Sequence, residues 1–92
     1  MMSTIEKVQE EVWVEELVGL NNEIILFNDD VNTFDHVIET LIRVCNHDAL
    51  QAEQCALLVH YKGKCGVKTG SYDELKPQCS ALLDAGLSAE IQ

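Results

Sequence analysis

The sequence predicts an α+β fold of the α/β-sandwich type, in which three helices pack on a small three-stranded antiparallel sheet. Three observations support this prediction. The chain has 92 residues, enough for one domain with one modest core. Apolar residues make up 47% of it, which favours folding over disorder. Apolar runs and helix-capping residues alternate in the order strand, helix, helix, strand, helix, strand.

The first strand is predicted at residues 24–27. This short apolar run, Ile-Ile-Leu-Phe, ends at the polar residues Asn28, Asp29 and Asp30. A buried central strand that leads into a polar turn has this pattern.

The first helix is predicted directly after this turn. Asn32 can cap its first turn, and Asp35 places negative charge at the positive end of the helix dipole. Five apolar residues follow at helical spacing: Phe34, Val37, Ile38, Leu41 and Cys45. They form one stripe, which we expect to face the core.

The second helix and the second strand come next. Asp48 with Gln51 resembles a capping arrangement, and Gly63 is expected to end the helix that Asp48 opens. Residues 65–69 are short and β-branched enough to form the second strand.

The third helix and the last strand complete the order. Ser71 with Glu74 forms an S-x-x-E capping box. Pro77, at the sixth helical position, removes one backbone hydrogen bond and is expected to kink the first turns. Gly86 ends this helix, and residues 87–91 are predicted to form the last strand.

The first 22 residues differ in character from the rest. They hold five glutamates and one lysine, and their apolar residues fit neither a period of two nor one of 3.6. Gly19 with Asn21-Asn22 is typical of a turn or hinge. We therefore expect residues 1–22 to be an acidic, flexible extension and residues 23–92 to be the folded core.

The charge balance excludes several classes of partner. Sixteen acidic residues against six basic ones give a net charge of −10. Nucleic acid and anionic membrane surfaces are poor partners, because binding them requires clustered lysine and arginine.

The longest apolar run is the five residues 55–59, and no signal peptide is predicted. We expect a cytoplasmic monomer.

The cysteines indicate neither a disulfide framework nor a metal site. The four cysteines are too far apart in the sequence for any two of them to form a CxxC pair: Cys45, Cys55, Cys65 and Cys79. We expect free, mostly buried thiols of a cytosolic protein. A metal site using Cys65 has no supporting ligand spacing, and no cofactor is expected.

The polar turn after the first strand allows two interpretations. Counting Asn28 as position one of a calcium loop places Asp30 at three, Asn32 at five and Glu39 at twelve. However, Thr33 occupies the place of the required glycine, and an apolar run rather than a helix precedes the loop. Alternatively, two adjacent carboxylates beside asparagine acceptors form an anionic site for a compact cation such as an ammonium group.

A histidine on the second helix is the other candidate site residue. Ala56, Val59 and His60 lie at i, i+3 and i+4, so His60 is predicted at the rim of a small apolar face. A neutral imidazole there could accept a hydrogen bond from an amine, although such a histidine is also a common structural residue. No nucleophile, metal-protease or phosphate-binding motif is present, so we expect a binding protein and no catalytic residues.

Two segments carry a resemblance to a known family. The first is ILFNDD at residues 25–30, with NTF at 32–34 and Val37, and the second is VHYKGK at residues 59–64, with CGV at 65–67. Together they resemble the ClpS family of adaptors, which deliver N-degron substrates to Clp-type AAA+ unfoldases. The resemblance covers residues 23–92, and its specificity comes from the pairing of NDD with a downstream VHYxGK.

The resemblance implies a site for a free α-amino group. Asn28, Asp30 and His60 would contact the amine of a substrate whose first residue is Leu, Phe, Tyr or Trp, and Asp29 would add charge. An α-amine has a pKa of about 7.7–8.0, so it is mostly cationic at neutral pH, and anionic acceptors favour that form. An acetylated terminus would leave these polar groups unpaired.

The resemblance also implies an apolar pocket for the first side chain, formed by Val37, Ala56, Val59 and Leu87. Asn32 falls where the family usually has Thr beside the peptide backbone. Phe34 falls at the gate, where Met is common, and narrows it. Ala56 replaces a bulkier residue and enlarges the floor, so the preferred first residue is left open.

The resemblance extends to the partner. Ser71 and Lys76 align with a surface that docks on the N-terminal domain of a ClpA- or ClpC-type unfoldase, although the family's usual glutamate is absent at Ser71. The stretch from Lys64 to Gly66 is two residues shorter than usual, so the strand pairing there is expected to differ. Residues 1–22 match the family's N-terminal extension in position.

The residues leave two other functions open. One is a calcium- or metal-responsive regulatory protein that uses the NDD turn. The other is an interaction domain that has the fold but has lost amine recognition.

Overall fold

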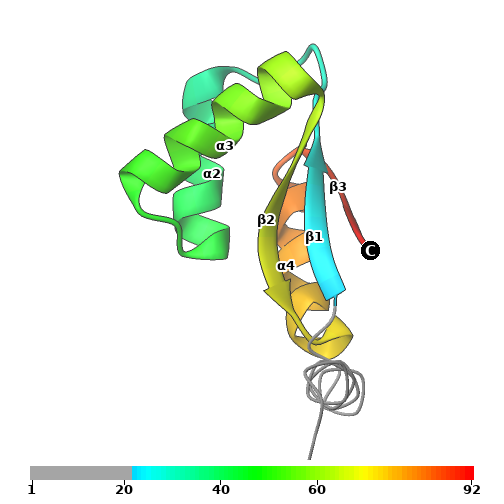
Figure 1. The fold of residues 1–92 in the computed structure, drawn as a ribbon. Coiled ribbons are helices and arrows are strands. Elements are labelled where there is room, and N and C mark those ends of the chain that lie inside the picture. The colour runs from blue at the N-terminus through cyan, green and yellow to red at the C-terminus, as the bar shows by residue number, and fades with distance from the viewer. Residues whose placement is uncertain (1–21) are drawn as a thin grey trace, which may run out of the picture.

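The computed structural model describes residues 22–92 and contains three strands and three helices within that range (Figure 1). They are, in chain order, β1 (Asn22–Phe27), α2 (Phe34–Cys45), α3 (Ala49–Lys62), β2 (Lys64–Gly70), α4 (Tyr72–Asp84) and β3 (Ser88–Ile91). This order confirms the predicted one. The predictions for residues 1–21 lie outside the described residues, and Asn22 begins β1 instead of ending the extension.

The sheet is antiparallel, with β1 in the middle in the order β2-β1-β3. Because β1 is the middle strand of the sheet, its apolar side chains Ile24 and Leu26 are fully buried. In the β1–β2 ladder Ile24 faces Lys68 and Ile25 faces Gly66, so Val67 is an extra residue in β2. The strand pairing is thus irregular at this point of β2.

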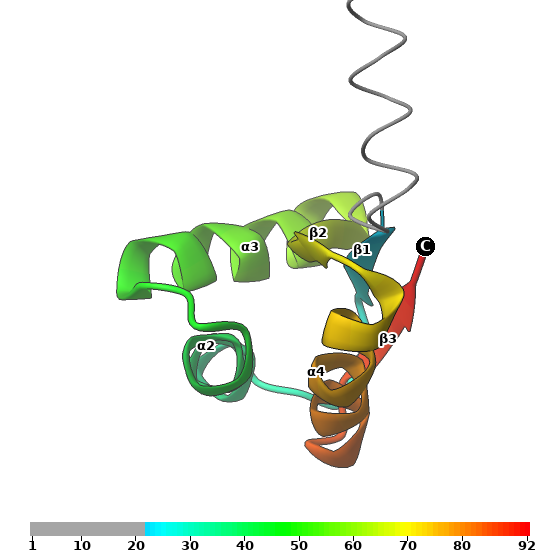
Figure 2. The ribbon, with the colours of Figure 1, turned by 90° about the horizontal axis from the view of Figure 1, so that it is seen from below.

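The helices divide into two groups (Figures 1 and 2). Helix α4 packs on β1 and β3, while α3 contacts β2 along one side and α2 along the other. The core between these layers is largely apolar, and its largest fully buried side chains include Leu41, Leu75 and Leu82. These contacts confirm the α+β sandwich.

Two of the three predicted helix caps are confirmed and one is wrong. The Asp48 side chain accepts a hydrogen bond from the Gln51 backbone N–H at 2.7 Å, and Ser71 Oγ accepts one from the Glu74 N–H at 3.1 Å. The first helix is capped by Thr33 rather than Asn32, because Thr33 Oγ1 accepts from the backbone N–H of the third helical residue at 3.1 Å.

The apolar stripe of α2 faces the core except at its first residue. Leu41 and Cys45 are buried, and Val37 and Ile38 pack partly buried against the same cluster. Phe34, by contrast, is 40% exposed. Helix α4 runs from Tyr72 to Asp84 with Pro77 inside it.

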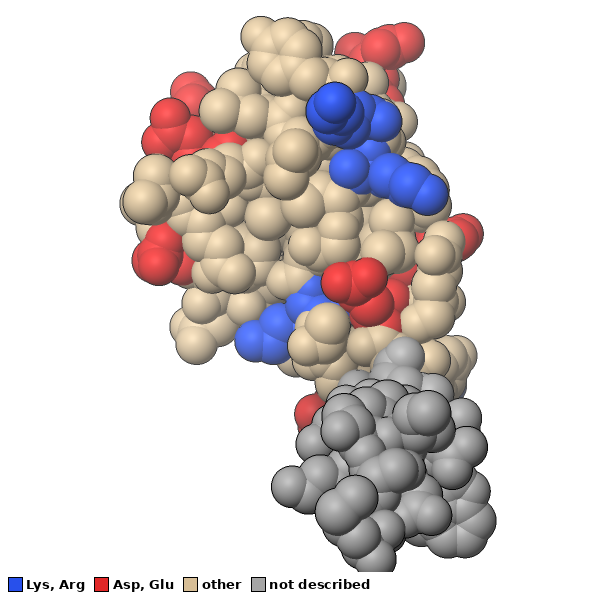
Figure 3. Space-filling view, in the orientation of Figure 1, with Lys and Arg blue, Asp and Glu red and all other residues tan. Residues whose placement is uncertain are grey.

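On the face shown in Figure 3, the acidic side chains of the described residues lie at several separate places and not in one patch. No helix within residues 22–92 has both the length and the apolar character needed to cross a membrane.

Candidate functional site

A small pocket lies where the end of β1, the start of α2 and the last turns of α3 meet, and its volume is about 60 Å³. Its lining residues are Leu26, Phe27, Asn28, Asp29, Asn32, Phe34, Val37, Ala56, Val59, His60 and Leu87. The structure therefore brings together every residue predicted for the amine site and the apolar pocket except Asp30, which is exposed outside the lining.

Asp29 organises the turn that follows β1. Its Oδ1 atom accepts hydrogen bonds from the backbone N–H groups of Val31 and Asn32, both at 3.0 Å. The Asn32 side-chain amide also donates to both carboxylate oxygens, at 2.9 and 2.8 Å. A side-chain carboxylate that accepts from the backbone in this way stabilises a tight turn.

These hydrogen bonds favour the ionised form of Asp29. Burial by itself would raise the pKa of Asp29, but hydrogen bonds from Asn32, the Val31 backbone and Ser88 outweigh it and lower the pKa below the usual value of 3.8. Asp29 is consequently an anion at neutral pH. The sequence predicted Asp30 as an amine contact and Asp29 as added charge, whereas the structure places Asp29 at the pocket.

The end of α3 holds this turn in place. The backbone N–H of Asn28 donates to the carbonyl of Gly63 at 2.9 Å. Gly63 ends α3 in the left-handed conformation, with φ of 93°, which suits glycine. As a result, the polar turn and the last turn of α3, which carries His60, lie together.

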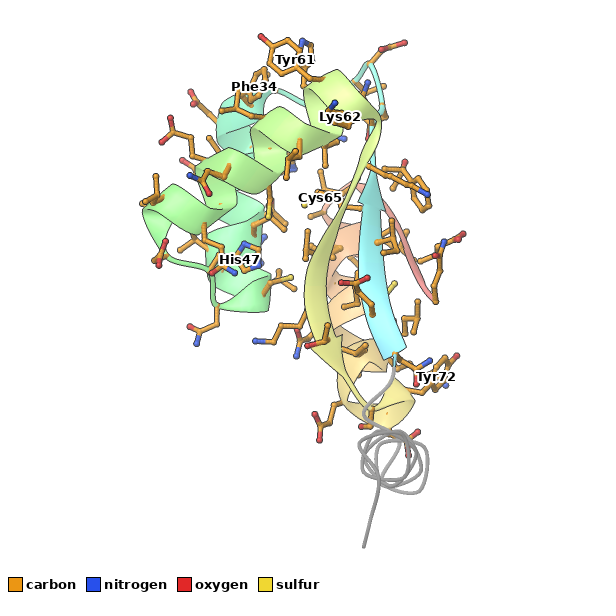
Figure 4. The ribbon with its side chains drawn as sticks, viewed as in Figure 1. Phe34, His47, Tyr61, Lys62, Cys65 and Tyr72 are labelled. Carbon is orange, nitrogen blue, oxygen red and sulfur yellow. The ribbon has the colours of Figure 1, made fainter. Side chains whose placement is uncertain are left out.

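His60 lies between two aromatic rings at the mouth of the pocket. Its ring centroid is 5.1 Å from that of Phe34 and 4.8 Å from that of Tyr61, which meets it edge-on. Figure 4 shows Phe34 and Tyr61 together at this end of the molecule. The imidazole is exposed, so a ligand at the mouth can reach it.

The pocket interior is apolar and buried. Leu26, Val59 and Leu87 are between 1% and 6% exposed, and the small side chain of Ala56 is 3% exposed. Charge and hydrogen-bonding groups at the mouth and apolar groups inside suit a ligand with a cationic end and an apolar body.

Sequence reasoning missed Leu26 and Phe27 as pocket residues. Both belong to β1 and were assigned only to the predicted strand. Their position immediately before the polar turn was the available signal, since the end of a strand shares the location of the turn that follows it.

The residues predicted for docking lie elsewhere. Ser71 caps α4, and Lys76 is exposed on the same helix. The labelled Tyr72, next to Ser71, lies at the opposite end of the molecule from Phe34 (Figure 4). Neither Ser71 nor Lys76 lines the pocket.

Metal ligands are not gathered in the described part of the chain. Within residues 22–92 no group of three or more His, Cys, Asp or Glu side chains could hold a metal ion. In the proposed calcium loop, the Asn32 amide nitrogen faces the Asp29 carboxylate, and Thr33 serves as a helix cap. The described residues therefore offer no set of ligands that would support the calcium interpretation.

Comparisons with known proteins agree on one family. The family model described as ATP-dependent Clp protease adaptor protein ClpS matches residues 21–90. The ATP-dependent Clp protease adapter protein ClpS of Acetivibrio thermocellus is 45% identical over 51 residues, which cover 55% of this chain and 52% of the relative. The protein of that name from Campylobacter jejuni is 41% identical over 49 residues, 51% of each chain. The chain thus spans about half the length of the curated relatives it matches.

A solved structure shows the same fold. The structure of Agrobacterium tumefaciens ClpS2 bound to L-phenylalaninamide aligns with a TM-score of 0.71 and 19% sequence identity. The alignment covers 77% of this chain and 93% of that one.

Proposed function

Because the chain belongs to the ClpS family of ATP-dependent Clp protease adaptor proteins, we propose that it binds N-degron substrates by their free α-amino group and bulky hydrophobic first residue. It would hand them to a Clp AAA+ unfoldase for degradation, in the cytoplasm and without an enzymatic activity of its own. The observation that carries this proposal is an ionised carboxylate, that of Asp29, at the mouth of a buried apolar pocket.

The mouth of the pocket is suited to a terminal ammonium group. Such a group has three N–H donors, and Asn28, Asp29 and His60 supply an amide oxygen, a carboxylate and an imidazole nitrogen around one opening. A hydrogen bond from a cation to a carboxylate is about twice as strong as a neutral one. Asp30, exposed beside them, adds negative charge to the approach.

The interior of the pocket is suited to a large apolar side chain, but the mouth must open. A cavity of about 60 Å³ is smaller than the roughly 150 Å³ of an apolar cavity that holds benzene. Phe34 lines the pocket, is 40% exposed and is tilted against His60, and its rotation would enlarge the cavity. Phe, Tyr and Trp would thus require a larger movement of Phe34 than Leu.

The neighbour bound to L-phenylalaninamide supports this proposal. That ligand carries a free α-amine and an apolar side chain, the two features that we propose this chain recognises. The proposed partner is the N-terminal domain of a ClpA- or ClpC-type unfoldase, docked on the α4 end that carries Ser71 and Lys76.

Peptides that differ only in their first residue test the proposal. Each carries a fluorophore at its other end, and binding is measured by fluorescence anisotropy. We expect Leu, Phe, Tyr and Trp peptides to bind about tenfold or more tightly than Ser or Glu peptides, because burying a large apolar side chain contributes about 1.5–3 kcal/mol. Equal affinities for the Phe and Ser peptides would refute the proposal.

A further inference from the structure

The turn between α4 and β3 forms one wall of the pocket through Leu87, which is 4% exposed. Only two residues, Ala85 and Gly86, separate the end of α4 from Leu87. Backbone hydrogen bonds join Gly86 N–H to the Leu83 carbonyl at 2.9 Å and Leu87 N–H to the Leu82 carbonyl at 3.1 Å. These bonds fix the turn to α4 but not to the rest of the pocket.

Two side chains, one from the polar turn before α2 and one from the first turn of α2, bind carbonyls of this turn. His36 Nε2 lies 2.8 Å from the Ala85 oxygen, and Asn32 Nδ2 donates to the Gly86 oxygen at 2.8 Å. A carbonyl oxygen can only accept, so His36 must carry its proton on Nε2. Two consecutive carbonyls are therefore held by residues about 50 positions earlier in the chain.

Both donors are themselves held rigidly. The Asn32 amide is fixed by the two oxygens of Asp29, so one hydrogen-bond chain runs from the proposed amine site to the wall of the pocket. The His36 backbone belongs to the capped first turn of α2, with its N–H bonded to Thr33 and its carbonyl to the Thr40 hydroxyl. A side chain on a fixed backbone positions its partner more accurately than a free one.

We propose that Asn32 and His36 are positioning residues that hold Leu87 in the wall of the pocket and thereby set its affinity for the first side chain. The affinity part of this inference rests on the proposed function. Asn32 does not cap α2, because its side chain binds the Gly86 carbonyl instead. The sequence did not indicate a role for His36, because its partner lies 49 residues away.

Four variants test the inference by peptide affinity. His36→Leu removes only the hydrogen bond to Ala85, and we expect it to weaken binding of a Phe-initial peptide by about 3- to 10-fold, the usual effect of one hydrogen bond. Asn32→Ala removes the bond to Gly86 and both bonds to Asp29, so it should weaken binding at least as much. His36→Gln restores an N–H donor of similar reach and should remain within about twofold of wild type. Glu39→Ala, on the exposed face of the same helix, is the matched control.

A second readout requires no peptide. The amide and methyl resonances of Leu87 are recorded by NMR in each folded variant. We expect them to move in Asn32→Ala and His36→Leu and to return toward wild type in His36→Gln, a rescue that a merely structural loss would not produce. Thermal unfolding of the same samples confirms that each variant is folded.

The two readouts separate the inference from the proposed function. If wild type fails to bind the Phe peptide, the proposed function is wrong, and Leu87 resonances that still move sustain the positioning role alone. Unmoved Leu87 resonances in both donor deletions overturn the inference. So does a Phe-peptide affinity that stays at the wild-type value while Leu87 moves.

Discussion

Asp29 and Asp30 show how adjacent identical residues acquire different roles. Asp29 accepts four hydrogen bonds from Val31 and Asn32 and lines the pocket, whereas Asp30 is exposed. The sequence predicted that the two aspartates form an anionic site, and the position of Asp29 in the pocket lining is consistent with that prediction. It could not distinguish their roles, because the difference depends on which carboxylate turns back toward its own backbone.

The stability of the turn should depend on pH through Asp29. Its pKa is lowered in the folded protein, so its contribution is present above the unfolded pKa and is lost as pH falls through the folded value. We expect the thermal unfolding midpoint of wild type to fall more steeply than that of Asp29→Asn as the pH drops below about 4, the usual pKa of an aspartate. Asp30→Asn, the matched control, should keep the wild-type slope. Identical slopes for wild type and Asp29→Asn would contradict this assignment.

His60 should contribute directly to binding. In His60→Ala an amine would lose one acceptor at the mouth, and we expect Phe-peptide affinity to fall by about 1–3 kcal/mol, the cost of an unpaired polar group. Gln54→Ala, exposed elsewhere on α3, is the control and should bind as wild type does. Isothermal titration calorimetry measures both. An unchanged affinity in His60→Ala would remove His60 from the site.

At the scale of elements, local signals predicted most of the fold. The caps at Asp48 and Ser71 and the helix end at Gly63 were identified because their partners lie within four residues. The cap of α2 was predicted one residue early. Asn32 and Thr33 both carry side chains that can cap a helix. The Asn32 side chain instead donates to Asp29 and to the Gly86 carbonyl, and the second of these partners, 54 residues away, is not encoded in any local pattern.

Gly63 ends α3, and its carbonyl accepts a hydrogen bond from Asn28 in the polar turn. The stability of the protein should therefore be sensitive to substitution of Gly63. Its φ of 93° disfavours any residue with a Cβ, although no described atom beyond the two adjoining residues lies within 4 Å of where that Cβ would be. We expect Gly63→Ala to lower the free energy of unfolding by about 1–2 kcal/mol, measured by urea denaturation. The free energy of unfolding should fall less in Gly63→Asn, because asparagine tolerates this backbone conformation. A Gly63→Ala protein as stable as wild type would contradict the strain argument.

At the scale of the whole molecule, three of the four cysteines are components of the core. Cys45, Cys55 and Cys79 are buried, and Cys65 is partly exposed. Burial raises the pKa of Cys45 to about 11 and that of Cys55 to about 12, the latter with help from the Cys65 thiol, and it also raises the pKa of Cys79. The predicted free, mostly buried thiols are confirmed.

Alkylation should therefore distinguish Cys65 from the rest. At pH 8, iodoacetamide should add rapidly to Cys65 alone in the folded protein and to all four cysteines in denaturant, since the thiolate is the reactive form. Mass spectrometry of the intact chain counts the adducts, and peptide mapping locates them. Rapid modification of Cys55 in the folded protein would contradict the burial described.

The whole molecule also separates its two proposed tasks in space. The pocket lies at one end, and the start of α4, with Ser71, lies at the other (Figures 1 and 4). An adaptor arranged in this way can hold a substrate and a partner together. The sequence alone could not establish this separation, because it depends on how α4 packs across the sheet.

The central claim is that this pocket binds a free α-amine attached to an apolar first residue. It is tested most directly by ¹H–¹⁵N NMR spectra recorded during titration with a Phe-initial peptide and, separately, with its N-acetylated form. We predict that the free peptide shifts the backbone resonances around Asn28, Ala56, His60 and Leu87, and that the acetylated peptide leaves them in place. Equal shifts with both peptides, or shifts confined to α4, would contradict the account.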